Sequence, residues 1–336
     1  MTKPGSDYIL LGCPFDNGIR SMLRYRRGTT GAAHGPDAIL DALRRDHPEI
    51  AQSVEFQRLD LADYNLPIDP ERWDDFSFIE HQLDATLQAH ADIEDAVRAI
   101  VADGRWPIGV GGDHSVSYPL ARGIMRQASP SRWGLIYIDV HLDLRAWNVE
   151  GGEDVISSGN TFWRLLEDSA VHLKGSNVVA IGVQPSHSPV YRRLRDRAQQ
   201  RDLTIIPRHE ITLKGTAAVA ERALEMAGRD TDAIYLSLDM DAFDASVAPG
   251  VSAPNDHGLT KDEGLDLLGK LAQDTRVKSM DAVETSSRET AWFEIVKTES
   301  RDESPGERAD KLERTAFVAA DAIQRFINAK TAPSSH

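Results

Sequence analysis

The segment Tyr137-Ile138-Asp139-Val140-His141-Leu142-Asp143 ends an apolar run with an aspartate, a histidine and an aspartate at alternate positions. The segment Leu236-Ser237-Leu238-Asp239-Met240-Asp241 repeats the construction with two aspartates. Because successive side chains of an extended chain point to opposite faces, side chains two residues apart share one face. Carboxylates that converge at the end of a buried strand repel one another unless they bind cations or stay protonated. The two segments therefore predict a metal site at the ends of two strands.

Apolar, β-rich runs alternate with helical patterns along the whole chain. We expect strands at residues 8–13, 106–110, 133–140, 177–183, 203–207, 233–239 and 277–283. We expect helices at residues 36–45, 80–103, 117–128, 189–201, 217–228, 261–273 and 312–328. This alternation is typical of an α/β protein in which helices cover both faces of a mainly parallel central sheet, in three layers, α/β/α. Ligands of such sheets bind outside the carboxyl ends of the strands, where the aspartates fall.

The domain organisation follows from the absence of a clear linker. No stretch rich in proline, glycine and serine divides the 336 residues, so we expect one domain over residues 1–329. Residues 330–336 are predicted to form a flexible tail. Two polar inserts, residues 67–78 and 297–310, are predicted to be solvated loops without a role in the chemistry.

The composition indicates a soluble cytoplasmic protein and excludes several classes of partner. Hydrophobic residues make up 41% of the chain, which suffices for a sizeable core, and no apolar run is long enough to span a membrane. The first residues lack the apolar region of an export signal, and the one cysteine, Cys13, suits a reducing compartment. The net charge of -15 argues against a nucleic-acid partner and is compatible with a small cationic substrate.

A third segment, Gly111-Gly112-Asp113-His114-Ser115, also follows an apolar run. Its glycines allow a tight turn close to a ligand, and its histidine places an imidazole at the strand end. The three segments together offer two histidines and four aspartates, namely His114, Asp139, His141, Asp143, Asp239 and Asp241. This set is too large for a tetrahedral zinc site, whereas two ions that share bridging carboxylates would use it fully. Four carboxylates also balance two divalent cations, which makes a buried site feasible.

The same three segments resemble the signatures of a known family. GGDHS at 111–115, DVHLD at 139–143 and SLDMDAFDASVAPG at 237–250 are similar to the motifs of the ureohydrolases, which include arginase, agmatinase, guanidinobutyrase and formimidoylglutamase. The segments at 12–16 and 35–39 are similar to the opening of that family. The resemblance covers nearly the whole chain and implies an arginase-like fold. It also implies oligomers of three or six subunits.

The resemblance implies a binuclear centre, with manganese as the expected metal and nickel as an alternative. One ion would be held by His114, Asp139, Asp143 and Asp239, and the other by Asp139, His141, Asp239 and Asp241. A hydroxide shared by the ions would attack the carbon of a guanidino or formimino group. Asp241 or Asp143 would orient it and pass a proton to the leaving nitrogen, and Glu284 matches the family glutamate that pairs with the cationic end of the substrate.

The loop at 156–164 departs from most of the family. Ser158 stands where arginase-like and agmatinase-like members carry a histidine, and the loop is closer to that of formimidoylglutamase. Ser158, Asn160 and Trp163 are candidates for substrate contacts, and Trp147 and Trp292 are also expected on loops near the mouth of the site.

The expected activity is hydrolysis of a linear amidine or guanidino compound, in the manner of agmatinase or guanidinobutyrase, with release of urea or a substituted urea. Formimidoylglutamase, which would yield formamide and glutamate, is the first alternative. The second is a non-catalytic subunit that partners an active paralogue, because the loop histidine is missing. The third is a deacetylase-like amidohydrolase on a related fold, which the three motifs fit less well.

Overall fold

The central element is one parallel sheet. The computed structural model describes residues 7–23, 29–66, 76–128, 132–146, 156–288 and 304–332. Within these residues the strand order is β2-β1-β3-β8-β7-β4-β5-β6, and each pair of neighbours is parallel. The strands are β1 (Tyr8–Cys13), β2 (Glu55–Arg58), β3 (Trp106–Gly111), β4 (Trp133–Ile138), β5 (Val178–Val183), β6 (Thr204–Pro207), β7 (Ala233–Asp239) and β8 (Val277–Val283).

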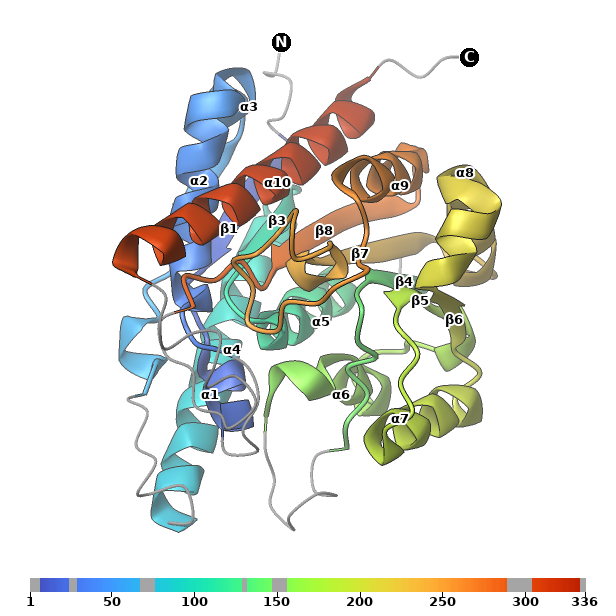
Figure 1. Ribbon diagram of the computed structural model, residues 1–336, viewed down its shortest axis with the longest axis horizontal. Helices are drawn as coiled ribbons and strands as arrows, with labels where there is room; N and C mark the ends of the chain where they lie inside the picture. The colour runs from blue at the N-terminus through green and yellow to red at the C-terminus, as the bar shows by residue number, and fades with distance from the viewer. Residues whose placement is uncertain are drawn as a thin grey trace.

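Helices cover both faces of this sheet, as Figure 1 shows for α9 and α10 on one side and α5, α6 and α7 on the other. The helices are α1 (Asn17–Leu23), α2 (Gly35–Asp46), α3 (Pro48–Ser53), α4 (Phe76–Ala102), α5 (Ser117–Gln127), α6 (Thr161–Glu167), α7 (Pro189–Gln200), α8 (Arg208–Ala227), α9 (Lys261–Gln273) and α10 (Pro305–Thr331).

Alternation of side chains along each strand builds two separate cores. In β4, Ile136 and Ile138 pack in the core formed with α2, α8, α9 and α10. Leu135 and Tyr137 point the other way, into the core formed with α4, α5 and α6. This period of two is the one that an extended chain imposes. The three-layer α/β/α fold with a parallel sheet is therefore confirmed.

The strands were easier to predict than the shorter elements. All seven expected strands are present, although β4 stops at Ile138 because residues 139–143 leave the sheet. The edge strand β2 was missed, since its side chains are largely exposed and carry no apolar pattern. The helices α1, α3 and α6 were also missed, because segments of six or seven residues are too short for a clear helical period.

The prediction that residues 297–310 form a loop is wrong for its last part. The helix α10 begins at Pro305, where Ser304 and Glu307 form a capping box that starts the helix. Residues 297–303 lie outside the described part of the chain, as do 67–75 of the other insert, whose last residues, 76–78, are not a loop as predicted but begin α4. At the other end α10 continues to Thr331, so the first two residues of the expected tail are helical.

The sheet order brings four chain segments to one place. The strands β3, β8, β7 and β4 are neighbours in the middle of the sheet and run in the same direction. Their carboxyl ends therefore meet at one edge, and the segments that follow them begin at residues 112, 284, 240 and 139. These are the segments that carry the predicted polar residues.

Replacement of Gly112 by alanine tests how closely the backbone segments approach each other at this edge. A Cβ atom at position 112 would lie 1.8 Å from the carbonyl oxygen of Phe15. We expect Gly112→Ala to lower the free energy of unfolding by about 1–3 kcal/mol, because the backbone on both sides has to move. Urea denaturation measures the change. Gly306→Ala in α10, whose Cβ would meet nothing closer than 3.9 Å, is the control and should change stability by less than about 1 kcal/mol. Equal stability of both variants would contradict the close approach.

Candidate metal centre

The first imidazole of the site is fixed by the turn that follows β3. Asp113 caps this turn, since its carboxylate accepts hydrogen bonds from the backbone N–H of Ser115 at 2.9 Å and of Ile19 in α1 at 2.8 Å. The carbonyl oxygen of His114 accepts a hydrogen bond from the Thr161 hydroxyl at the start of α6. Two helices therefore hold the His114 loop against the end of the sheet.

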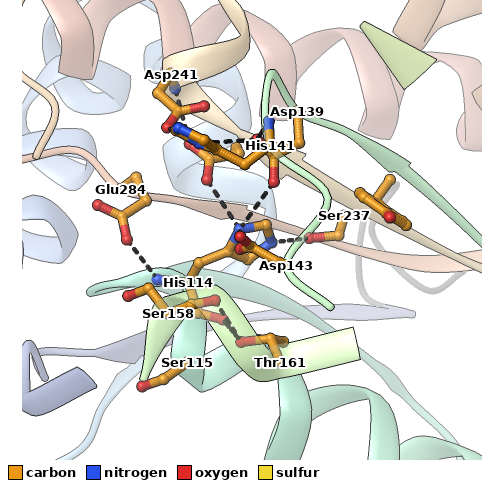
Figure 2. A network of polar contacts seen from close by, with 12 residues as sticks. His114, Ser115, Asp139, His141, Asp143, Ser158, Thr161, Ser237, Asp241 and Glu284 are labelled. Atoms are coloured by element: carbon orange, nitrogen blue, oxygen red, sulfur yellow. Dashed lines mark hydrogen bonds and ion pairs between the residues drawn. The ribbon is translucent and has the colours of Figure 1, made fainter. Parts of the chain in front are cut away.

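The six predicted ligand residues lie together, as Figure 2 shows for five of them. The Nδ1 atom of His114 lies 2.8 Å from Asp239 Oδ2, 3.0 Å from Asp143 Oδ2 and 3.4 Å from Asp139 Oδ2. The Nδ1 atom of His141 lies 3.0 Å from Asp241 Oδ2 and 3.5 Å from Asp139 Oδ1. Asp139 thus stands between the two imidazoles. Two overlapping groups result, one around each histidine.

Unsatisfied atoms in this cluster show that its donor set fits cations. His114 Nδ1, Asp139 Oδ2 and Asp241 Oδ1 are buried and have no hydrogen-bond partner. Buried polar atoms without a partner are rare, because each loses its hydration without compensation. Imidazole nitrogens and carboxylate oxygens that face one another across such a gap are the ligand types of divalent metal ions.

A buried hydrogen-bond chain orients the first imidazole. The Nε2 atom of His114 lies 3.2 Å from the hydroxyl oxygen of Ser237. That hydroxyl donates to Asp281 Oδ1 at 2.6 Å, and the Tyr235 hydroxyl donates to Asp281 Oδ2 at 2.6 Å. Because the Ser237 proton goes to Asp281, its oxygen accepts from Nε2–H, which leaves the Nδ1 lone pair facing the carboxylates.

Backbone groups hold two of the carboxylates. Asp139 Oδ1 accepts a hydrogen bond from the N–H of His141 at 2.6 Å, and Asp239 Oδ1 accepts one from the N–H of Asp241 at 2.8 Å. In each case the residue two positions later supplies the donor, so the alternation seen in the sequence also fixes the side-chain rotation. Asp143, at φ 46°, turns the chain out of this pattern.

The pKa shifts of the clustered carboxyl groups show that negative charge is unfavourable at several of them. Burial, with the charges of Asp139 and Glu284 added, raises the pKa of Asp241 to about 7, although His141 acts against the shift. Burial and the charge of Asp239 raise the pKa of Glu284 to about 8. Burial also acts to raise the pKa of Asp139, but the two neighbouring histidines outweigh it and hold that pKa well below its usual range. Protonation and cations are the two ways to relieve this crowding.

The cluster forms one wall of a cavity of about 130 Å³. The residues that line the cavity are Ile19, His114, His141, Asp143, Arg145, Ser158, Gly159, Asp239, Asp241, Ser252, Ala253 and Glu284. Five of them were missed in the sequence: Ile19, Arg145, Gly159, Ser252 and Ala253. Arg145 follows Asp143 by two residues, and this spacing was the signal that could have revealed it.

Glu284 lies on the cavity wall where β8 ends. Its φ of 69° turns the chain away from the strand, and its N–H donates to the carbonyl oxygen of Gly112 at 2.8 Å. Its Oε1 accepts a hydrogen bond from the backbone N–H of His114 at 2.8 Å, and its Oε2 accepts one from the Ser252 hydroxyl. The carboxylate therefore faces the cavity and also supports the His114 loop.

The candidates for substrate contacts fall in different places. Ser158 lines the cavity. Asn160 is buried and its side-chain oxygen accepts a hydrogen bond from the N–H of Ser157, as part of the capping box of the 3-10 turn Ser158–Asn160 that precedes α6. Trp163 does not line the cavity, and its ring packs 5.3 Å from the guanidinium of Arg197 on α7. Trp147 and Trp292 lie outside the described residues.

The sequence model of the arginase family matches residues 6–326. The chain belongs to the arginase family. Members of this family are hydrolases that act on C–N bonds in amidine and guanidine compounds, and the chain is a hydrolase of this class. The cluster of histidines and aspartates corresponds to the metal-binding character of the family.

Individual relatives within the arginase family differ in substrate. Formimidoylglutamase from Halalkalibacterium halodurans is 30% identical over 258 residues, which cover 76% of this chain and 74% of that protein. N(1)-aminopropylagmatine ureohydrolase from Thermus thermophilus is 29% identical over 281 residues, which cover 83% of this chain and 82% of that protein.

Solved structures share the arginase-family fold. Formimidoylglutamase from Bacillus subtilis superposes with a TM-score of 0.73 at 22% identity, over 99% of this chain and 90% of that one. Formiminoglutamase from Trypanosoma cruzi with Mn²⁺ superposes with a TM-score of 0.64 at 24% identity, over 94% of each chain. Among the described residues of this chain, no helix is long and apolar enough to cross a membrane.

Replacement of Ser237 by alanine tests the hydrogen-bond chain from His114 through Ser237 to Asp281. We expect Ser237→Ala to weaken divalent-metal binding by about 10–100-fold, because the imidazole loses the partner that fixes its orientation. Titration calorimetry with Mn²⁺ measures the affinity. Ser186→Ala, an exposed serine outside the cavity, is the matched control and should bind metal as the wild type does. Unchanged affinity in Ser237→Ala would show that the chain does not orient the ligand.

Proposed function

We propose that this arginase-family chain is a binuclear-metal hydrolase of linear amidines and that the six clustered residues are its metal ligands. His114, Asp139, Asp143 and Asp239 would hold one ion, and Asp139, His141, Asp239 and Asp241 the other. The observation that carries the assignment is the pair of Nδ1 atoms, each facing carboxylates, with unsatisfied buried atoms between them. Asp139 would bridge because its two oxygens face the two imidazoles, and Asp239, whose Oδ2 faces His114, would be the second bridge by its match to the family motif.

We propose manganese as the metal, with nickel as the alternative. Four carboxylates and two imidazoles form a hard donor set with no thiolate, and manganese prefers such ligands. The solved Trypanosoma cruzi structure with Mn²⁺ supports this choice for a related fold. When bound, divalent cations supply the charge that polarises an amidine and lowers the pKa of water.

The remaining steps belong to side chains on the cavity wall. Glu284 would pair with the protonated amidine, because its carboxylate borders the cavity beside the ligand cluster. Asp241 would orient the attacking water and carry a proton to the leaving nitrogen, because its Oδ1 faces no other hydrogen-bond donor. Asp143, which also lines the cavity, is the second candidate for this role. Asn160 and Trp163 would act through the position of α6.

Two reactions fit this arrangement. A guanidino substrate takes up water and gives urea or a substituted urea with an amine, in the manner of agmatinase or guanidinobutyrase. A formimino substrate takes up water and gives formamide with glutamate. Formimidoylglutamase is supported by the Halalkalibacterium halodurans relative and by Ser158 in the loop before α6. A subunit that binds metal without turnover, and needs an active paralogue, is the remaining alternative.

We also propose that the chain works in the cytoplasm as a homo-oligomer of three or six subunits. The single buried cysteine suits a reducing compartment. Light scattering of the metal-loaded chain measures the oligomeric state, and a monomer would contradict the proposal.

The bridging assignment predicts the effect of removing one carboxylate. We expect Asp139→Ala and Asp239→Ala each to lose both ions and activity by at least about 100-fold, because each variant removes ligands from both sites. Elemental analysis after gel filtration measures the metal content. Asp256→Ala, an exposed aspartate on the loop after β7, should keep two ions per chain. Two ions in Asp139→Ala would exclude its bridging role.

The choice between the two reactions is made by the product. Chain loaded with Mn²⁺, and in parallel with Ni²⁺, is incubated with guanidino compounds and with formimidoylglutamate. We expect near two metal ions per chain and release of either urea or formamide. Urea identifies a guanidine hydrolase and formamide identifies the formimino reaction. If the chain binds two ions but hydrolyses no substrate, and a paralogous subunit restores hydrolysis, the partner-subunit alternative replaces the proposal.

A further inference from the structure

The cavity has a second polar region besides the metal ligands. Ser158, Gly159 and Arg145 line it together, and Figure 2 shows Ser158 on the side of His114 away from Asp241. Among the described lining residues, Arg145 is the one side chain with a permanent positive charge. The rest of the charged lining consists of three aspartates, one glutamate and two histidines. A cation in such a lining needs a specific reason.

The backbone fixes where Arg145 lies. Its N–H donates to the carbonyl oxygen of Gly159 at 3.0 Å, so the loop after β4 and the turn before α6 run side by side. A Cβ atom at position 159 would lie 2.9 Å from both Cδ and Nε of Arg145. The arginine side chain therefore lies across Gly159, and the glycine makes room for it at the cavity wall.

Ser158 adds a hydroxyl to the same region. The residue is 7% exposed, and its Oγ is buried without a hydrogen-bond partner. Serine hydroxyls in such positions nearly always have a partner, because an unsatisfied one loses its hydration without compensation. The cavity is the open side of Ser158, so a ligand in the cavity can supply the acceptor.

We infer that Arg145 and Ser158 bind a carboxylate of the substrate, so that this site acts on amidino acids rather than on amidino amines. The inference rests on the proposed function and names its substrate class: a guanidino or formimino group at one end and a carboxylate at the other. A guanidinium and a hydroxyl on adjacent segments are a matched donor pair for a carboxylate.

Charge complementarity separates the two classes of substrate. Glu284 offers a negative charge for the amidine, and Arg145 offers a positive charge in the region of Ser158. An amidino acid carries the opposite charges in the same arrangement. A diamine derivative such as agmatine brings a second cation to the arginine, which places like charges together and selects against it.

The test compares three guanidino compounds that differ at the end remote from the guanidino group, together with one formimino acid. Metal-loaded wild type is assayed with 4-guanidinobutyrate, its uncharged amide, agmatine and formimidoylglutamate. We expect kcat/KM for the better of the two acids to exceed that for agmatine by at least about 10-fold. Arg145→Met should raise KM for that acid by about 10–100-fold, change kcat by less than about 3-fold, and leave the KM of the amide nearly unchanged.

Three further variants make the comparison specific. Arg145→Lys keeps the charge and should restore part of the lost affinity, whereas Ser158→Ala should raise KM for the acid by several-fold. Arg192→Met, an exposed arginine on α7, is the matched control and should behave as wild type. Metal content, measured by elemental analysis, should stay at the wild-type value in all four variants. A higher kcat/KM for agmatine than for either acid would overturn the inference. An equal rise in KM for the acid and the amide in Arg145→Met would also overturn it.

A binding measurement separates this inference from the proposed function. Calorimetric titration of the metal-loaded chain with glutamate, 4-aminobutyrate and 1,4-diaminobutane needs no turnover. We expect one of the two acids to bind more tightly than the diamine and to lose at least about 10-fold of its affinity in Arg145→Met. Hydrolysis without this acid preference would refute the carboxylate site alone. Acid binding that depends on Arg145, with no hydrolysis of any amidine, would support the site and refute the proposed function.

Discussion

The rest of the structure depends on the repulsion between aspartates that the fold holds close together in a buried site. Four aspartates lie within a few ångströms of two imidazoles at the carboxyl edge of a buried sheet, where water is largely excluded. Such an arrangement is unstable on its own, because burial and mutual repulsion both favour the protonated acids. The surrounding protein compensates only in part, through backbone N–H groups that hold Asp139 and Asp239. Divalent cations at this donor set would supply the remaining positive charge, so the fold that gathers the carboxylates and the proposed metal chemistry depend on one another.

The sequence predicted this part of the molecule because its geometry is periodic. The alternate spacing in the sequence marked the aspartates and histidines that follow β4 and β7 as one group, although in the structure the chain leaves the extended conformation at the end of each strand. The strands themselves were visible because they are buried on both sides and read as continuous apolar runs. Long helices such as α9 were found through their helical apolar pattern.

What could not be predicted depends on how irregular segments fold against one another. Ser252 and Ala253 reach the cavity from a loop, where no period relates a residue to its neighbours. Trp163 was expected near the mouth, but α6 turns its ring toward α7, and the Asn160 side chain caps the 3-10 turn that precedes this helix. The short elements α1 and β2 depend on tertiary contacts. The Asn17 side chain donates a hydrogen bond to the Thr86 hydroxyl of α4, and β2 pairs with β1 as a parallel strand.

The order of the strands has a consequence for how the protein is made. The last strand in the sequence, β8, lies between β3 and β7 in the middle of the sheet, and β3 and β7 lead to His114 and Asp239. A nascent chain that has not yet released residues 277–283 from the ribosome lacks the strand that joins these two, so it cannot bring their side chains together. A metal site built from these residues would therefore be completed only late in biosynthesis, and until then the unpaired edges of β3 and β7 can associate with other chains.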